Sequence, residues 1–133
     1  NISSNAHICA TGVDEQCSMI FSYPGGSLAS LNCSFSVDSP CQAAVYGTKG
    51  YIRIPHMFFH PDTFSVKIGE LPEKEYSFNR LGNGYTYQAL EVMQCLRDGK
   101  LQSQIMPWSA SASIMRTMDK IRKQWNLVYP CEK

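Results

Sequence analysis

The sequence has no long apolar run and almost no net charge, and both absences narrow the classes of protein it can encode. Its longest apolar runs are only a few residues, far short of the roughly 20 that a membrane-spanning helix needs. The 12 basic and 11 acidic residues are scattered and give a formal net charge of +1. We therefore expect no membrane insertion and no nucleic-acid surface.

A nicotinamide-binding motif is also missing. A dinucleotide site needs a G-x-G-x-x-G turn between a strand and a helix, because the pyrophosphate must approach backbone N–H groups at the helix N-terminus. Gly82-Asn83-Gly84 lacks the third glycine and does not follow a buried parallel strand, so we interpret it as a turn that leads into a helix. The sequence predicts no cofactor site in this chain.

Motifs for metal binding and catalysis are equally sparse. His56 and His60 have the i, i+4 spacing of two metal ligands on one helical face. Pro55 and Pro61 bracket them and oppose a helix, and no third ligand is evident. We interpret both as loop histidines and expect no metal site. No nucleophile elbow is present, and we assign no catalytic residue.

The cysteine pattern indicates free thiols. There are six cysteines but no CxxC pair, and a chain of this size does not need disulfides to fold. The first residues lack the basic and apolar regions of a signal peptide. We expect reduced thiols and a cytoplasmic protein.

Two segments near the end of the sequence carry the helical period. In the first, an apolar stripe begins after Asn83 and Gly84 and stops at Gly99, where a left-handed cap would end a helix. In the second, the stripe runs from Ile114 to Trp125 behind a serine-rich entry at 109–111. Pro130 is expected to close this segment.

Apolar and polar residues alternate with the period of strands before these helices. The predicted strands are residues 16–23, 29–37, 42–46, 51–54, 63–68 and 76–78, with residues 1–11 as an uneven additional candidate. Strands first and helices last indicate an α+β domain, which we expect to be an open antiparallel β-sheet of about six strands with two C-terminal helices on one face. A chain of 133 residues should bury a single hydrophobic core.

The first predicted hairpin has a definite register. Pro24-Gly25-Gly26 marks its turn, and a slip of one residue would set the apolar side of one strand against the polar side of the other. Only an odd loop length avoids this. A three-residue loop places Cys17 opposite Cys33, Met19 opposite Leu31 and Phe21 opposite Ala29.

The C-terminal part of the sequence resembles the end of the Gfo/Idh/MocA oxidoreductases. In that family a GxGY element leads into a helix ending CLRxGK, followed by S-x-x-MPW, IMRTMDxIRxQ and YPxE. The matching residues are Gly82, Gly84, Tyr85, Cys95–Lys100, Ser103, Met106–Trp108, Ile114–Asp119, Ile121, Arg122, Gln124, Tyr129, Pro130 and Glu132. The match extends through residues 11–15 and 46–51 and is closest to the dihydrodiol dehydrogenase-like branch.

This resemblance implies a domain like the C-terminal domain of glyceraldehyde-3-phosphate dehydrogenase. Residues 1–133 would be a single substrate-side and oligomerisation domain, with the N-terminal Rossmann domain, its EKP motif and the catalytic helix absent from this chain. Glu73-Lys74-Glu75 resembles EKP but lacks the proline, and we interpret it as a solvated turn. The parent enzyme would use NAD or NADP on a sugar or diol-type alcohol, and this chain alone would be inactive.

Two groups of residues follow from the resemblance as site candidates. It implies that the loop at 55–61 and the segment before GxGY face the substrate, so Phe58, Phe59 and Phe78 are candidates for the pocket wall. The alternative is that these rings only anchor the core or a loop.

Relatives in the resembled family look like dimers or tetramers that pack the open sheet face to face, so the resemblance implies a homodimer or a tetramer built from such dimers. The residues that would form its interface are Ser18, Ile20, Ser30 and Asn32. The alternative is a sheet face that is simply exposed to solvent. A second hypothesis for the whole chain is a free-standing binding or scaffold module with this fold and no chemistry.

Overall fold

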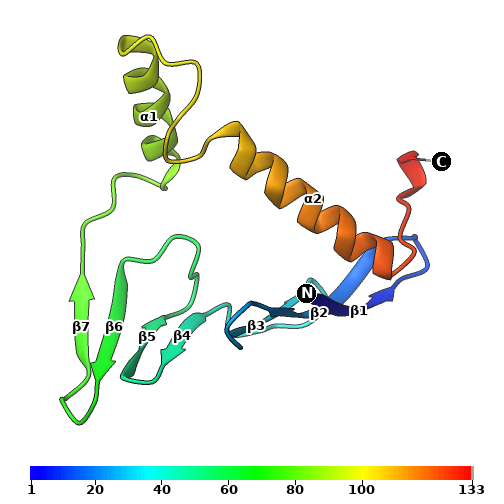
Figure 1. The fold of residues 1–133 in the computed structure, drawn as a ribbon, viewed down its shortest axis with the longest axis horizontal. Coiled ribbons are helices and arrows are strands. Elements are labelled where there is room, and N and C mark those ends of the chain that lie inside the picture. The colour runs from blue at the N-terminus through cyan, green and yellow to red at the C-terminus, as the bar shows by residue number, and fades with distance from the viewer. Residues whose placement is uncertain (133) are drawn as a thin grey trace. The chain divides into compact units, whose positions relative to one another are not determined.

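The computed structural model describes residues 1–132 (Figure 1). The chain divides into two compact units. Residues 1–39 and 104–132 form the first, and Pro40–Ser103 form the second.

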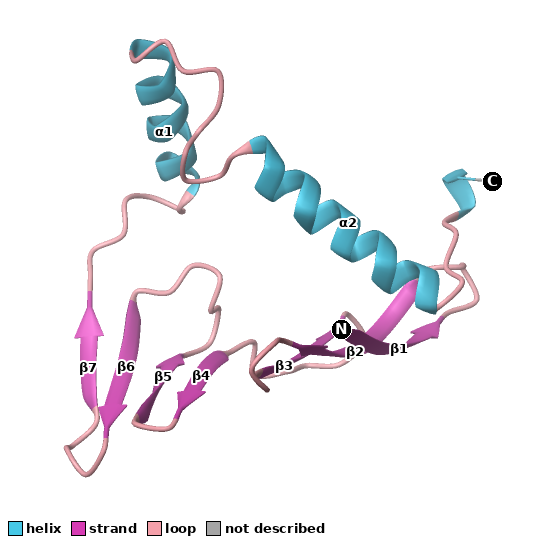
Figure 2. Cartoon of the chain, viewed as in Figure 1, coloured by secondary structure: helices cyan, strands magenta, loops and turns pink. Residues whose placement is uncertain are grey.

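The first unit is a three-stranded antiparallel sheet with a long helix. Strands β1 (Ile2–Ile8), β2 (Asp14–Ser22) and β3 (Leu28–Ser34) are hydrogen-bonded in the order β1-β2-β3 (Figure 2). Helix α2 spans Trp108–Gln124, and a short 3-10 helix, η1, spans Pro130–Glu132.

The predicted hairpin register is confirmed. Cys17 pairs with Cys33 in β2 and β3, and the pairs Met19–Leu31 and Phe21–Ala29 follow. The Tyr23 N–H donates to the Ser27 carbonyl at 3.0 Å, which closes the three-residue turn.

The second unit is a four-stranded antiparallel sheet with one helix. Its strands are β4 (Ala43–Gly47), β5 (Gly50–Ile54), β6 (Thr63–Ile68) and β7 (Lys74–Ser77), in that order in the sheet. Helix α1 spans Tyr85–Arg97.

The α+β class and the antiparallel pairing are confirmed. The strands form two hydrogen-bonded sheets, of three and four strands, where the pattern predicted one sheet of about six. The uneven N-terminal segment pairs along the whole of β2 as β1. Residues 35–42 form no strand, because Pro40 has no N–H to donate and Cys41 adopts a positive φ of 47°.

Helix α2 lies on one face of its sheet. The Gln124 amide donates to the Ile2 carbonyl at 2.8 Å, and the Ser4 hydroxyl donates to Gln124 Oε1 at 2.6 Å. These bonds attach the C-terminal end of α2 to β1. Helix α1, by contrast, packs against none of the four strands of its own unit among the described residues.

The helix ends are partly as predicted. Gly84 caps α1 at its start with a φ of 93°, and Gly99 follows its end with a φ of 65°. Helix α2 begins directly after Pro107, earlier than the serines at 109–111 suggested. It ends before Pro130, because Asn126 adopts a φ of 52° and the Leu127 N–H turns back to the Arg122 carbonyl.

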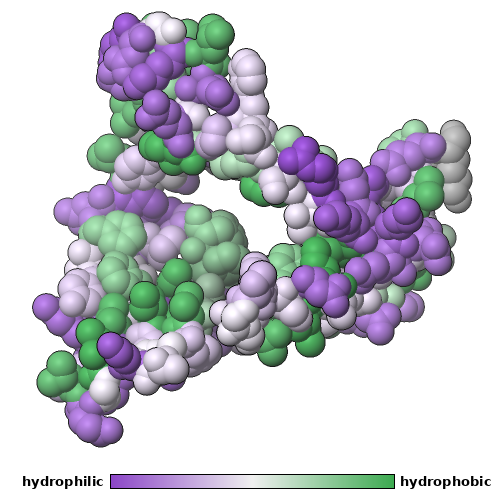
Figure 3. Space-filling view, in the orientation of Figure 1, coloured by the Kyte–Doolittle hydropathy of each residue, from purple (hydrophilic) through white to green (hydrophobic). Residues whose placement is uncertain are grey.

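The expected single hydrophobic core is wrong. Among residues 1–132 the buried apolar residues are Ile121 and Leu127, and most large apolar side chains are partly or largely exposed (Figure 3). The reason is that α1 covers no strand of its unit and α2 covers only part of its sheet. Neither helix combines the length and the apolar character that crossing a membrane requires, among the residues described.

Candidate functional site

The loop between β5 and β6 presents two of the three predicted pocket residues, Phe58 and Phe59. Its backbone is held by the Phe58 N–H, which donates to the Cys41 carbonyl at 3.2 Å, and by a turn from His60 to Met57 at 2.9 Å. Met57 adopts a left-handed φ of 64° in this turn. The loop therefore displays both rings from a hydrogen-bonded frame.

The rings in this loop form a small aromatic ladder. The Phe58 and Phe59 centroids are 5.8 Å apart and edge to face, and the Phe59 ring meets the His60 ring at 4.8 Å in the same geometry. Phe58 is 44% exposed and Phe59 is 62% exposed. The ladder is thus an open apolar surface rather than part of a core.

Phe78 lies at the same end of this sheet. Its N–H donates to the Asp62 carbonyl at 3.1 Å, which extends the β6–β7 pairing by one residue beyond Thr63–Ser77. The Arg80 Nε donates to Asp62 Oδ1 at 3.1 Å and fixes the chain after β7. Phe78 is 46% exposed, so it too is available to a ligand.

The structure therefore brings the three predicted residues to one end of the four-stranded sheet. The ring contacts in this region run from Phe58 through Phe59 to His60. Phe78 is connected to the same end of the sheet by the hydrogen bond from its backbone N–H to the Asp62 carbonyl. His60 and the Asp62–Arg80 pair were missed by the sequence reasoning. The signal for the pair was the opposite charges beside the predicted strands 63–68 and 76–78, but the pairing of these strands was not predicted.

The two histidines of the loop make different contacts. His56 Nδ1 lies 3.0 Å from the Pro40 carbonyl, which ties the loop to the chain before β4, and the His60 ring contacts the Phe59 ring edge to face. Residues 55–61 form a loop, as the two prolines predicted. Within residues 1–132 no three histidine, cysteine or acidic side chains are grouped as metal ligands.

The interpretation of Glu73-Lys74-Glu75 as a solvated turn is right about exposure, since all three residues are exposed, and wrong about the turn. Lys74 and Glu75 belong to β7, and Glu73 accepts hydrogen bonds from Ser65 at 2.5 Å and Tyr51 at 3.2 Å. The Ser65 hydrogen bond, then that of Tyr51 and the nearby Arg53 charge, lower the pKa of the Glu73 carboxyl. The sequence does not reveal this cluster, because its members come from β5, from β6 and from the residue before β7.

The described strands of the second unit differ from those of a dinucleotide-binding domain. All described strand pairs are antiparallel, so the parallel βαβ unit that aims a helix N-terminus at a pyrophosphate is missing from them. At the start of α1, the Tyr85 N–H already donates to Asn83 Oδ1 at 3.3 Å and the Tyr87 N–H to the Gly84 carbonyl. Gly82-Asn83-Gly84 is a helix entry here.

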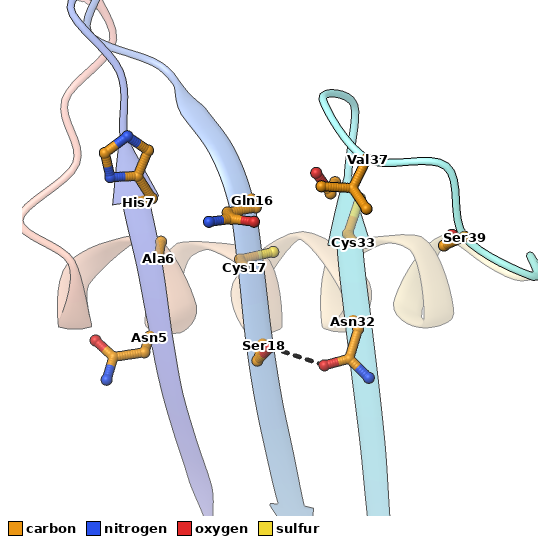
Figure 4. Close-up of a pocket in the computed structure, with 11 residues that line it drawn as sticks. Asn5, Ala6, His7, Gln16, Cys17, Ser18, Asn32, Cys33, Val37 and Ser39 are labelled. Atoms are coloured by element: carbon orange, nitrogen blue, oxygen red, sulfur yellow. Dashed lines mark hydrogen bonds between the residues drawn. The ribbon is translucent and has the colours of Figure 1, made fainter.

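The four predicted interface residues share the face of the three-stranded sheet that α2 leaves open. Ser18 pairs with Asn32, and Ile20 pairs with Ser30, so all four side chains point the same way. The Ser18 hydroxyl donates to Asn32 Oδ1 at 2.7 Å (Figure 4). Ile20 and the neighbouring Leu28 are both exposed.

An apolar groove of about 740 Å³ lies between α2 and the other face of this sheet. Met19 and Leu31 line it from the strands, and Ile114 and Met118 line it from the helix. The buried Nε1 of Trp125 has no hydrogen-bond partner among the described residues. Such an open apolar surface is typical of a site that another part of a protein covers.

Comparisons with known proteins identify relatives of this chain by sequence. The chain is 34% identical over 136 residues to the trans-1,2-dihydrobenzene-1,2-diol dehydrogenase of Xenopus tropicalis, covering 98% of this chain and 41% of that protein. The human protein of the same name is 32% identical over 130 residues, covering 92% and 38%. The chain is a homologue of the dihydrodiol dehydrogenases. The resemblance to the C-terminal domain of Gfo/Idh/MocA oxidoreductases is thereby confirmed.

A solved structure supports the same fold. The aldose-aldose oxidoreductase of Caulobacter crescentus, complexed with glycerol, matches with a TM-score of 0.75 at 16% identity, over 92% of this chain and 37% of that one. No protein-family model matches the sequence. The chain spans about two-fifths of the length of the curated relatives that it matches.

Proposed function

We propose that this chain is the substrate-side and dimerisation domain of a cytoplasmic NAD(P)-dependent oxidoreductase that acts on a sugar or diol-type alcohol. The observation that carries the proposal is the homology to trans-1,2-dihydrobenzene-1,2-diol dehydrogenases, which extends over 98% of the chain. The solved oxidoreductase with the same fold was complexed with glycerol, a polyol. A hydroxylated substrate is consistent with both.

The rest of the enzyme would supply the cofactor chemistry. NAD or NADP accepts or donates the hydride when bound, and a Rossmann domain outside this chain would hold it. The antiparallel pairing of the described strands supports this assignment, because a dinucleotide site of that kind is built on parallel βαβ units. The open apolar groove supports the presence of further protein against this chain. Alone, the chain should be inactive.

Phe58, Phe59 and Phe78 would form the apolar wall of the substrate pocket. A wall of this kind carries no proton but excludes water and holds the reacting carbon in a narrow range of positions. The hydrogen bonds that hold the loop at Cys41 and the strand end at Asp62 keep the rings in place. The wall thus acts by positioning rather than by acid–base chemistry.

The open face of the three-stranded sheet would form the homodimer interface. A two-fold axis makes such a patch self-complementary. The small side chains of Ser18 and Ser30 would let two sheets approach closely, and Ile20 would add apolar contact. A stable contact of this kind should bury on the order of 1,200 to 2,000 Å² in total.

The test uses the enzyme encoded by the whole gene. NAD(P)H formation is followed at saturating NAD⁺ or NADP⁺ with trans-dihydrodiols and with aldoses. Phe58→Ala should lower kcat/KM by about 10-fold or more, as expected for a lost apolar contact in a pocket. Phe35→Ala, which truncates an exposed phenylalanine of the other unit, is the matched control.

Three outcomes contradict the proposal. A gene product without a dinucleotide motif would favour the scaffold hypothesis. Nicotinamide binding by the 133-residue chain alone would overturn the assignment of the cofactor to another domain. Equal effects of Phe58→Ala and Phe35→Ala on kcat/KM would contradict the assignment of Phe58 to the pocket wall.

A further inference from the structure

The three-stranded sheet holds two thiols directly opposite each other. Cys17 in β2 is the register partner of Cys33 in β3, and both cysteines are free. Because side chains of opposed residues lie on the same face of a sheet, the two sulfur atoms share the face that α2 partly covers. Both residues line the apolar groove between this face and α2.

The backbone spacing of this pair suits a covalent link. The Tyr23 N–H donates to the Ser27 carbonyl and the Phe35 N–H to the Glu15 carbonyl, at 3.0 and 3.2 Å. These bonds show that Tyr23–Ser27 and Glu15–Phe35 are hydrogen-bonded pairs. Such pairs recur at every second position of an antiparallel ladder, so Cys17–Cys33, two positions from Glu15–Phe35, is also a hydrogen-bonded pair. Such pairs have Cα atoms about 5.5 Å apart, within the roughly 4.4 to 6.8 Å that disulfides span. Their Cβ atoms, up to about 5.5 Å apart, must approach to within about 4.5 Å when the link forms.

The two thiols differ in access. Cys33 is exposed, whereas Cys17 is partly buried. Burial raises the pKa of the Cys17 thiol, and the neighbouring Cys33 raises it further. An oxidant in solution therefore reaches Cys33 first, and Cys17 is placed to react with the product. The other cysteines have different surroundings; Cys9, for example, contacts the Thr11 hydroxyl at 3.0 Å.

We propose that Cys17 and Cys33 form a reversible dithiol–disulfide pair that a peroxide oxidises. The Cys33 thiolate attacks a peroxide oxygen, the O–O bond breaks, and a sulfenic acid and a hydroxide form. The Cys17 thiolate then attacks the sulfenic sulfur, the S–S bond forms and the S–O bond breaks. Each hydroxide takes up a proton, so two thiols and one hydrogen peroxide give one disulfide and two waters. A dithiol reductant reverses the step.

The link would act on the groove and on the hairpin. It would join β2 to β3 across the intervening turn, and so limit the unfolded chain more than the folded one. It would also replace two thiols in the wall of the apolar groove by one disulfide. This inference does not depend on the proposed enzymatic function.

The test treats the chain with one molar equivalent of hydrogen peroxide at pH 8. Digestion with Glu-C and chymotrypsin, which can cut after Glu15, Phe21 and Leu31, separates Cys17 from Cys33 and from the other cysteines. We expect one linked peptide pair containing Cys17 and Cys33, with the loss of two hydrogen atoms, and its release by a dithiol. The oxidised chain should melt several degrees higher than the reduced chain.

Two controls keep this result specific. Cys33→Ser should abolish the link and the rise in melting temperature, whereas Cys9→Ser should change neither. The same oxidation in concentrated urea should give a mixture of cysteine pairings. The proposal is overturned if the folded chain gives that same mixture, or if Cys33 proceeds to a sulfinic acid while Cys17 stays a thiol.

Discussion

The unit built from β1–β3 and α2 differs from the unit built from β4–β7 and α1 in how its apolar residues are covered. In the first, α2 is hydrogen-bonded to β1, and Ile121 and Leu127 are 6% and 8% exposed. In the second, no described residue is buried to that degree, and Val45 and Tyr76 lie open on the strands. Helix α2 is hydrogen-bonded to its sheet, whereas α1 contacts no strand of its unit among the described residues. In that unit Glu73 accepts hydrogen bonds from Tyr51 and Ser65.

The comparison bears on function as well as stability. The better covered unit carries the polar sheet face that we propose as the dimer interface, and the less covered unit carries the three rings that we propose as the pocket wall. Apolar side chains left exposed in a folded chain mark surfaces that meet another molecule or domain. Substitutions of the same kind in the two units should therefore have different effects on assembly and on stability.

The largest expected effect is on assembly. Ser30→Arg would place like charges near a two-fold axis on the open face of the first unit, and should convert a dimer into monomers. Ser77→Arg, on an exposed strand position of the second unit, should leave the dimer intact. Light scattering at micromolar concentration measures the oligomeric state of both variants. A wild-type monomer at these concentrations, or equal dissociation by both variants, would refute the interface.

The next effect concerns the one small core. Ile121→Ala removes buried methyl groups and should lower the free energy of unfolding by about 2 to 4 kcal/mol. Ile52→Ala, at an exposed strand position of the second unit, should cost about 1 kcal/mol or less. Urea unfolding followed by circular dichroism gives both values. Equal losses would show that the two units are covered to the same extent in solution.

A smaller effect should follow from cutting the attachment of α2. Gln124→Ala removes the hydrogen bonds to Ile2 and Ser4 and should cost about 1 kcal/mol, the usual net value of such bonds. Gln94→Ala in α1 is the control, because the Gln94 amide donates to Asp98 Oδ1 at the end of the same helix, at 2.8 Å, and not to a strand among the described residues. Hydrogen exchange should show faster opening of β1 in the first variant alone. Unchanged exchange in β1 would mean that α2 is held by its apolar contacts.

The sequence predicted the local features of the fold well. The alternation on either side of Pro24-Gly25-Gly26 excludes any slip of one residue, which would reverse the apolar face, and the three-residue turn then sets the β2–β3 register. Gly84 and Gly99 bound α1 as expected, since both adopt conformations that other residues rarely do. These features were predictable because they depend on residues that lie close together in the sequence.

The features that were missed depend on residues far apart in the chain. Nothing in the period of α1 shows that its apolar stripe lacks a strand to cover within its unit. The Glu73 cluster joins Tyr51, Ser65 and Glu73 across neighbouring strands, and its charged segment looks like a turn when read alone. The candidate rings were predicted by family resemblance, whereas the Asp62–Arg80 contact beside them needed the β6–β7 register.

The smallest effect should come from the Glu73 cluster, and it sharpens the contrast between a unit held by burial and one held by polar contacts. The Ser65 hydrogen bond, followed by that of Tyr51 and the Arg53 charge, lowers the pKa of Glu73 in the folded chain below its ordinary value of 4.5. A carboxyl whose pKa is lower when folded stabilises the fold above its unfolded pKa, and this contribution disappears as the pH falls through the folded pKa. Acid should therefore loosen β5–β7 below about pH 4.5.

Glu73→Gln removes this titration. In the variant, hydrogen exchange in β5–β7 should be faster than in the wild type at pH 7 and should depend less on pH below 4.5, where the wild type converges toward it. Glu70→Gln, in the turn between β6 and β7, is the matched control and should keep the wild-type profile. If Glu73→Gln retains the full acid response, other carboxyls hold the second sheet, and its polar cluster is a consequence of the strand pairing rather than a cause of its stability.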